Sequence, residues 1–344
     1  MIMNKKRLKF LLLACLCLTV LMIAAGVGSV QIGLADMIRI IGSKVFGTEL
    51  PESLDPILVS ILWKIRLPRA LAAFIEGAAL AVSGTVMQSV LRNPLASSYT
   101  LGVSAGASLG AALMIVTGVT IPLLGIFSLP LTGFLFGLAT VFLVMAFSRR
   151  LDQNMQNNTI ILVGMVISLF VNALLTLVTA LSNEHLQQLV FWQMGSFSAT
   201  DWSELAVITI VTLSCILLLM RYVQEMDIMT FGEEQALSAG VEIKKTKFIL
   251  IAISALITGT AVAFTGIIGF VDLIAPHLAR KIFGSSHRIV IPAAALSGGA
   301  LMTLADLISR TILSPSELPV GAVTAIIGAP FFAYIYFMKR KKVV

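Results

Sequence analysis

Charged residues are scarce in this sequence. Only 12% of its 344 residues are Asp, Glu, Lys or Arg, while 58% are hydrophobic, and the mean hydropathy is +0.99. A soluble domain of this size could not hide so much apolar surface from water. The apolar runs have the length of roughly 20 residues that a membrane-spanning helix requires, and they lack the alternation of barrel strands. The sequence therefore predicts an all-α polytopic membrane protein.

Metal-ligating and catalytic motifs are also missing. The three cysteines, Cys15, Cys17 and Cys215, lie inside apolar runs and form neither a metal spacing nor a disulfide framework, and the three histidines are far apart. We therefore expect no metal in this chain. The sequence contains no GxxxxGK[ST], HExxH, GxSxG or CxxC motif. We expect no enzymatic activity, so active transport would take its energy from another subunit or from an ion gradient.

Ten membrane spans can be drawn along the chain. The first, residues 10–30, follows a basic start; a cleaved secretory signal is the alternative, but the run is long for one. The other nine are residues 67–86, 95–116, 121–147, 159–181, 205–220, 248–268, 270–283, 289–308 and 318–338. The third follows a break at Asn93-Pro94, and the eighth is a short segment broken by Pro276.

The basic residues agree with this topology. If the N-terminus is inside, 18 of the 24 Lys and Arg residues fall in inside segments and six in outside segments. This bias predicts a cytoplasmic membrane protein with both termini in the cytoplasm. It also accounts for the net charge of +7 without any binding to nucleic acid.

Two stretches outside the spans are long enough for a specific role. Residues 31–65 lie outside, and residues 221–247 form an inside loop with charges of both signs. Residues 231–239 of this loop are predicted to form a short helix at the membrane surface.

Several polar residues stand out near the spans. Glu76, Asp272 and Asp306 are costly in hydrocarbon unless they are paired or face water. Glu76 is the deepest and is the candidate for a pathway-facing residue, whereas Asp306 can form an i,i+4 pair with Arg310. Arg66, Arg69 and Arg310 sit at outer edges, where they either snorkel to lipid phosphates or bind carboxylates of an external protein.

Two further groups could close the inner mouth of a pathway. One is Gln88, Arg92 and Asn93, and the other is Asn157, Asn158 and Thr159; ordinary solvated loops are the alternative for both. His277 follows Pro276, and a local hydrogen-bonding role is more common for such a histidine than metal binding.

At these residues the chain resembles the FecCD family, the permease subunits of binding-protein-dependent ABC importers for iron-siderophore complexes, haem and vitamin B12. The matching stretches lie between Arg66 and Phe332 and are RLPRALAAFIEGAALAVSGTVMQSVLRNPLA, LGVSAGA, GEEQALSAGV, GIIGFVDLIAPHLAR, ADLISR and ELPVGAVTAIIGAPFF. The chain departs from the family pattern at Glu76, at Asp272 and at Ser97 with Ser98 after NPLA.

The resemblance implies a type II ABC importer permease architecture, with one transmembrane permease domain over residues 1–344. It implies four partners on separate chains: two ATP-binding subunits that hold the ATP and Mg²⁺, a second permease that is identical or paralogous, and an extracytoplasmic binding protein. The loop 221–247 would carry the coupling helix that meets the ATPase, through Gly232, Glu233, Glu234, Ala236, Leu237, Gly240 and Val241.

The resemblance also implies roles for individual residues. Arg66, Arg69 and Arg310 match the arginines that dock the binding protein. The translocation path or gate would use Glu76, Gln88, Asn93, Pro94, Asn157, Asn158, Pro276 and His277.

An iron(III)-siderophore complex is the expected cargo, because siderophore carriers are the largest group in the family. Haem and vitamin B12 remain alternative cargoes. A different class of transporter, an ion-coupled secondary transporter, is the alternative to an ABC importer. Such a transporter would use Glu76, Asp272 and Asp306 but would leave the coupling segment without a role.

Overall fold

The computed structural model describes residues 2–51, 54–119 and 121–340, and every regular element in these ranges is a helix. The prediction of an all-α polytopic protein is confirmed. Two of the basic residues assigned to the inside, Lys341 and Lys342, lie outside the described ranges.

Seven helical segments of the described chain are long and apolar enough to cross a membrane. They are Lys6–Gly26, Pro56–Val90, Gly125–Leu151, Asn157–Ala180, Trp202–Met229, Ile243–Thr265 and His287–Thr311. The three other predicted spans correspond to α5 (Val103–Thr117), α13 (Val271–Phe283) and α15 (Val320–Arg340), of which α5 and α13 are too short to cross a membrane on their own. The count of ten is thus roughly compatible with the structure.

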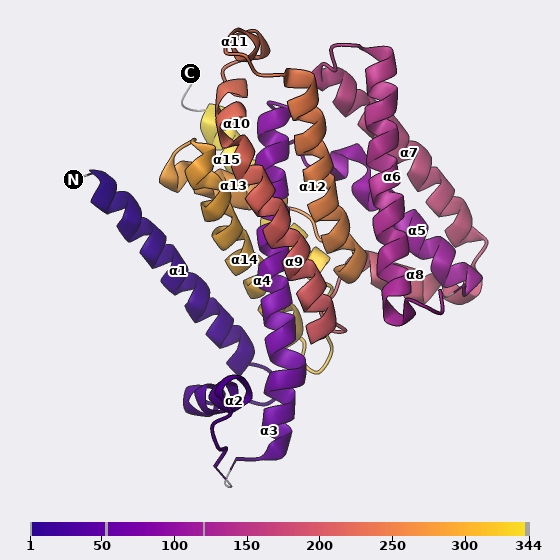
Figure 1. The fold of residues 1–344 in the computed structure, drawn as a ribbon. Helices are drawn as coiled ribbons and strands as arrows, with labels where there is room; N and C mark the ends of the chain where they lie inside the picture. Colours follow the sequence, from indigo (N-terminus) through magenta and orange to yellow (C-terminus); the bar gives the residue numbers. More distant parts are fainter. Residues whose placement is uncertain (1, 52–53, 120, 341–344) are drawn as a thin grey trace.

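The long helices form one bundle (Figure 1). Helix α4 (Leu67–Val90) packs against α12 (Ile243–Thr265), α13 and α14 (His287–Thr311), while α5 packs against α6 (Ser128–Leu151) and α7 (Asn157–Ala180). Helix α12 contacts both α4 and α6, so it joins these two groups. Helix α1 (Ile2–Gly26) lies on α14, and α9 (Trp202–Leu219) lies on α4 and α12.

Small residues set the distance between α4 and α14. A Cβ added at Gly77 would collide with the carbonyl of Gly298 and with the side chain of Met302, and one added at Gly84 would collide with the carbonyl of Asp272 on α13. The backbones therefore approach more closely than any larger side chain permits. This is how the Gly-rich and Ala-rich run found in the sequence is used.

Chain breaks separate α4 from α5. Asn93 accepts a hydrogen bond from the Leu95 amide at 2.9 Å, and Pro94 cannot continue the helix. A short 3₁₀ turn, η2 (Ser98–Leu101), and Gly102 at φ +84° follow before α5 begins at Val103. The predicted start of this span at residue 95 was therefore too early.

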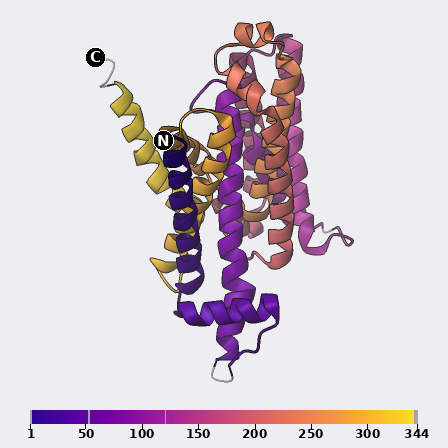
Figure 2. The ribbon, with the colours of Figure 1, turned by 60° about the vertical axis from the view of Figure 1, so that its left-hand side comes forward.

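Three short helices carry the chain outside the bundle. Helix α11 (Glu233–Ser238) lies at the end of the bundle that also holds both chain ends, whereas α2 (Leu34–Phe46) and α3 (Pro56–Ser60) lie at the opposite end (Figure 1). Figure 2 shows α2 lying crosswise beneath the long helices. Helix α8 (Leu186–Met194), between α7 and α9, was not expected from the sequence.

Candidate functional site

The loop predicted to couple the chain to an ATPase folds as a compact helical turn. Gly232 at φ +138° precedes α11, and Gly240 at φ +84° follows it, so both bends use backbone conformations that favour glycine. Ala236 is fully buried, and its carbonyl accepts the Val241 amide at 2.9 Å. Leu237, by contrast, is 61% exposed. The turn therefore has a packed inner side and presents an exposed leucine on its outer side.

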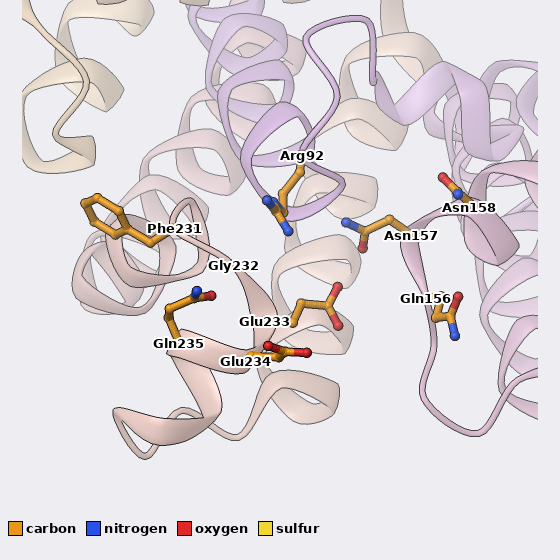
Figure 3. Close-up of a pocket in the computed structure, with 9 residues that line it drawn as sticks. All are labelled: Arg92, Gln156, Asn157, Asn158, Phe231, Gly232, Glu233, Glu234 and Gln235. Atoms are coloured by element: carbon orange, nitrogen blue, oxygen red, sulfur yellow. The ribbon is translucent and has the colours of Figure 1, made fainter.

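A pocket of about 540 Å³ lies between this turn, the end of α4 and the start of α7. It is lined by Arg92, Gln156, Asn157, Asn158, Phe231, Gly232, Glu233, Glu234 and Gln235. Figure 3 shows the side chains of Arg92, Asn157 and Glu233 converging on it from three segments that are far apart in the sequence. The fold thus brings together residues that were predicted separately as coupling and gate residues.

Glu233 is fixed to the bundle by a buried lysine. The Lys247 ammonium, on the first turns of α12, is fully buried and donates to Glu233 Oε1 at 2.7 Å and to the Met155 carbonyl at 3.0 Å. Met155 lies in the turn between α6 and α7, at φ +51°. One cation therefore connects α11, α12 and the turn that leads into Asn157.

The turn before α7 is also organised by Asp152. Its carboxylate accepts the Asn154 and Gln156 amides at 2.9 and 2.8 Å. These backbone hydrogen bonds favour the charged form and hold the pKa of Asp152 below its usual value. Beside it, Asn157 Oδ1 is buried and finds no hydrogen-bond partner among the described residues. Asn157 also lines the pocket described above.

A second link joins the coupling loop to the bundle. Asp227 on α10 (Val223–Met229) accepts the His287 amide at 2.9 Å and contacts the His287 Nδ1 at 2.5 Å. The other ring nitrogen, Nε2, lies 2.5 Å from the Ser89 hydroxyl on α4. The histidine ring therefore bridges α10, α14 and α4. Neither His287 nor Lys247 stands out in the local sequence. Asp227 lies 60 residues from His287, and Met155 lies 92 residues from Lys247, although Glu233 is only 14 residues from Lys247.

The other predicted gate residues lie elsewhere. Gln88 is buried and ties α4 to α13 through the Asp272 carbonyl, at 3.2 Å, and through Arg280. Asn93 and Pro94 form the turn after α4. Pro276 is buried inside α13, and His277 beside it is half-buried. None of these residues is among those that line the pocket beside α11.

Glu76 occupies the packed interior rather than a cavity wall. Its carboxyl group is 1% exposed, Oε1 accepts the Thr265 hydroxyl on α12, and Oε2 has no partner among the described residues. In this conformation it does not face an open path. Asp272 is also buried and accepts the Ser97 hydroxyl.

The three outer arginines are engaged within the chain. Arg66 donates to the carbonyls of Gly26, at 2.8 Å, and Val30, at the end of α1. Arg69 binds Asp306 at 2.8 Å. The predicted pair between Asp306 and Arg310 is present at 3.5 Å.

Arg69 also binds Glu317, and this contact faces outward. The two side chains meet through two hydrogen bonds of 2.7 and 3.0 Å. Glu317 is 39% exposed, whereas Arg69 is buried. Docking of an external protein through Arg69 therefore stays a prediction, and it would require Glu317 to be displaced.

The described residues contain no cluster of three His, Cys, Asp or Glu side chains that could hold a metal ion. The polar pocket beside α11 also lacks a nucleophile held against a base. What this site offers is a set of polar contacts that link a protruding helix to the bundle.

Comparison with known proteins agrees with this architecture. A profile of the FecCD transport family matches residues 15–338. The chain belongs to the FecCD transport family. This confirms the resemblance seen in the sequence motifs, and it agrees with an all-helical bundle of apolar helices.

Individual family members show the extent of the similarity. The uncharacterized ABC transporter permease protein YvrB of Bacillus subtilis (strain 168) is 39% identical, over 91% of this chain and 89% of its own. The hemin transport system permease protein HmuU of Yersinia pestis is 35% identical, over 94% of this chain and 95% of its own. A solved structure of a metal-chelate type ABC transporter in an inward-facing conformation has a TM-score of 0.82 and 31% identity, covering 95% of this chain and 97% of that one. Other relatives are named for the import of molybdate and cobalamin.

Proposed function

We propose that this FecCD-family permease carries an iron(III)-siderophore complex through the cytoplasmic membrane. Its family membership makes it the permease subunit of an ABC importer. The similarity to a metal-chelate type transporter over nearly the whole chain supports a chelated metal as cargo. Haem is the second candidate, because the hemin permease HmuU is similar over almost the full length of both chains.

The observation that supports coupling to an ATPase is the meeting of α11 with the turn before α7. ATP-driven closure of the partner subunits would push α11, because the exposed Leu237 is suited to sit in a cleft of the partner. Glu233 would pass the movement to Lys247 and to the Met155 carbonyl. The displaced turn would then move Asn157 at the inner mouth.

The assembly that this mechanism needs has four partner chains. Two ATP-binding subunits would lie against α11 and hold the ATP and Mg²⁺, and a second permease would complete the path. A binding protein would deliver the cargo at the opposite end, where α2, α3 and the Arg69–Glu317 pair lie. The cargo would arrive already wrapped by its chelator, so we expect the path to hold it weakly.

Coupling is tested by placing a charge on the outer side of α11. Leu237→Glu should weaken association with the ATPase by about 30-fold, because loss of a central apolar anchor costs about 2 kcal/mol. The readout is ATP hydrolysis of the reconstituted complex, with and without loaded binding protein. Gln224→Glu on α10 adds the same charge at another exposed position and is the matched control. Unchanged ATP hydrolysis in Leu237→Glu would contradict the coupling role and favour an ion-coupled transporter.

The cargo is tested separately by uptake. Cells lacking the gene should lose uptake of a labelled ferric siderophore and regain it with the intact gene. Loss of haem, cobalamin or molybdate uptake instead would keep the importer mechanism and replace the proposed cargo.

A further inference from the structure

A groove of about 1090 Å³ lies between the last turns of α6 and the first turns of α12. It is at the end of the bundle that carries α11. Four cationic side chains line it, Arg149 and Arg150 from α6 and Lys244 and Lys245 from α12. The transport mechanism above uses none of these four residues.

The floor of the groove is apolar and belongs to two membrane spans. Phe142 on α6 and Phe248 on α12 are 44% and 43% exposed, and their ring centroids lie 6.2 Å apart. Ala146, one turn beyond Phe142, continues the same surface. The segments that carry them, Gly125–Leu151 and Ile243–Thr265, are both long and apolar enough to cross the bilayer. The floor therefore runs from the membrane interior toward the cationic rim.

The positive charge of the rim is poorly compensated within the chain. Among the described residues Arg149, Arg150 and Lys244 form no ion pair, and Lys245 meets only the largely exposed Glu242, at 3.5 Å. A pair of this kind contributes little in water.

The first turn of α12 adds to this charge. It holds exposed lysines and no acidic residue, although the positive end of the helix dipole lies there. The chain alone thus leaves unfavourable repulsion at this place, which an anion would relieve.

We propose that this groove binds an anionic phospholipid, with the phosphate between the four cations and an acyl chain along Phe142 and Phe248. The general bias toward cytoplasmic basic residues explains charge at this end of the helices. It does not explain why four cations gather around an open apolar groove, which is the composition that anionic headgroups recognise. An ATPase surface would suit the cations but would leave the membrane-embedded floor uncovered.

The location suggests a consequence for coupling. Met155 lines the groove, and its carbonyl accepts the Lys247 ammonium that fixes α11. A bound lipid would therefore brace the same turn through which α11 is anchored. Occupancy of the groove should increase ATP hydrolysis stimulated by loaded binding protein.

The test is native mass spectrometry of the delipidated full-length chain, titrated with dioctanoyl phosphatidylglycerol and with dioctanoyl phosphatidylcholine. The phosphatidylglycerol should bind at least about tenfold more tightly. Arg149→Gln combined with Lys245→Gln should raise its Kd by about 25-fold, or about fivefold for each cation removed. The matched control, Arg221→Gln combined with Arg288→Gln, removes two exposed cations from the same end of the bundle and should change Kd less than about twofold.

A second variant separates a lipid from a free anion. Ala146→Trp keeps every cation but fills the floor, so it should weaken phosphatidylglycerol binding and leave competition by inorganic phosphate unchanged. The proposal is overturned if both charge pairs weaken binding equally, or if the two lipids bind equally well. It is also overturned if Ala146→Trp has no effect while inorganic phosphate displaces the lipid, because the groove would then be a free-phosphate site.

Discussion

Removing the ammonium group of Lys247 should release α11 from the bundle. Lys247→Met keeps the apolar stem but loses the hydrogen bonds to Glu233 at 2.7 Å and to the Met155 carbonyl at 3.0 Å. Hydrogen bonds made by charged groups contribute about 1.5–3 kcal/mol each. Breaking a fully buried pair can cost about 3–5 kcal/mol. Glu233 is already one-third exposed and can be hydrated after the change, so we expect a cost of about 2 kcal/mol, below the range for a fully buried pair.

This cost should be local to the coupling turn. A loss of about 2 kcal/mol makes local opening about 30-fold more frequent, so amides of residues 231–241 should exchange with deuterium about 30-fold faster. ATP hydrolysis should also become less dependent on loaded binding protein. Lys281→Met, at an exposed position on α13, is the control and should change neither quantity.

A double variant tests whether Glu233 is the partner that matters. Lys247→Met and Glu233→Gln should together cost less than the sum of their separate effects, because each removes the same contact. Additive effects would refute the pairing. Exchange at residues 231–241 that changes less than about threefold in Lys247→Met would refute the anchoring role altogether, since the expected change is about ten times larger.

Three further predictions concern packing, buried charge and pH. Gly77→Val should destabilise the bundle by about 1–3 kcal/mol through collision with the neighbouring helix, whereas Gly269→Ala, where an added Cβ meets nothing within 4 Å, should leave the melting temperature unchanged. Asp306→Asn should cost about 3 kcal/mol because it removes the buried carboxylate that Arg69 and Arg310 share. Glu317→Gln should cost far less and, if the binding protein docks there, should tighten its association at low salt. Because the pKa of Asp152 is lowered in the folded chain, its contribution to stability is complete above the unfolded value near 3.8 and is lost only as pH falls through the lower folded value. In the wild type, the amides of residues 154–156, compared with a helical segment of the same chain, should therefore lose no protection from hydrogen exchange between pH 8 and 5. In Asp152→Asn the same amides should lose protection already at pH 7.

The predicted helix in the coupling loop illustrates which features can be predicted from neighbouring residues alone. Gly232 and Gly240 mark the two bends, and the polar residues between them favour a short surface helix, which the structure has as Glu233–Ser238. The break at Asn93-Pro94 was found in the same way, because proline acts on its immediate neighbours. The true start of α5 at Val103 was missed, because the residue types alone do not reveal the 3₁₀ turn at Ser98–Leu101 or the positive φ of Gly102.

The roles of charged residues were harder to predict. Arg66 and Arg69 stand three residues apart at an outer edge, and nothing nearby in the sequence shows that both are buried. Arg66 binds the end of α1, 40 residues away, and Arg69 binds Asp306, 237 residues away. Glu76 was expected at a pathway but is held in helix packing by Thr265, 189 residues away.

The sequence by itself determined that this protein is a helical membrane protein and which segments are apolar enough to cross a bilayer, with some errors at their ends. These properties depend on local hydropathy and on the need to satisfy backbone hydrogen bonds in lipid. Only the tertiary structure decided that Lys247 joins the coupling helix to the turn before α7, and that four cations border one apolar groove. Such contacts depend on how distant helices pack, and the spacing of residues along the chain does not record that packing.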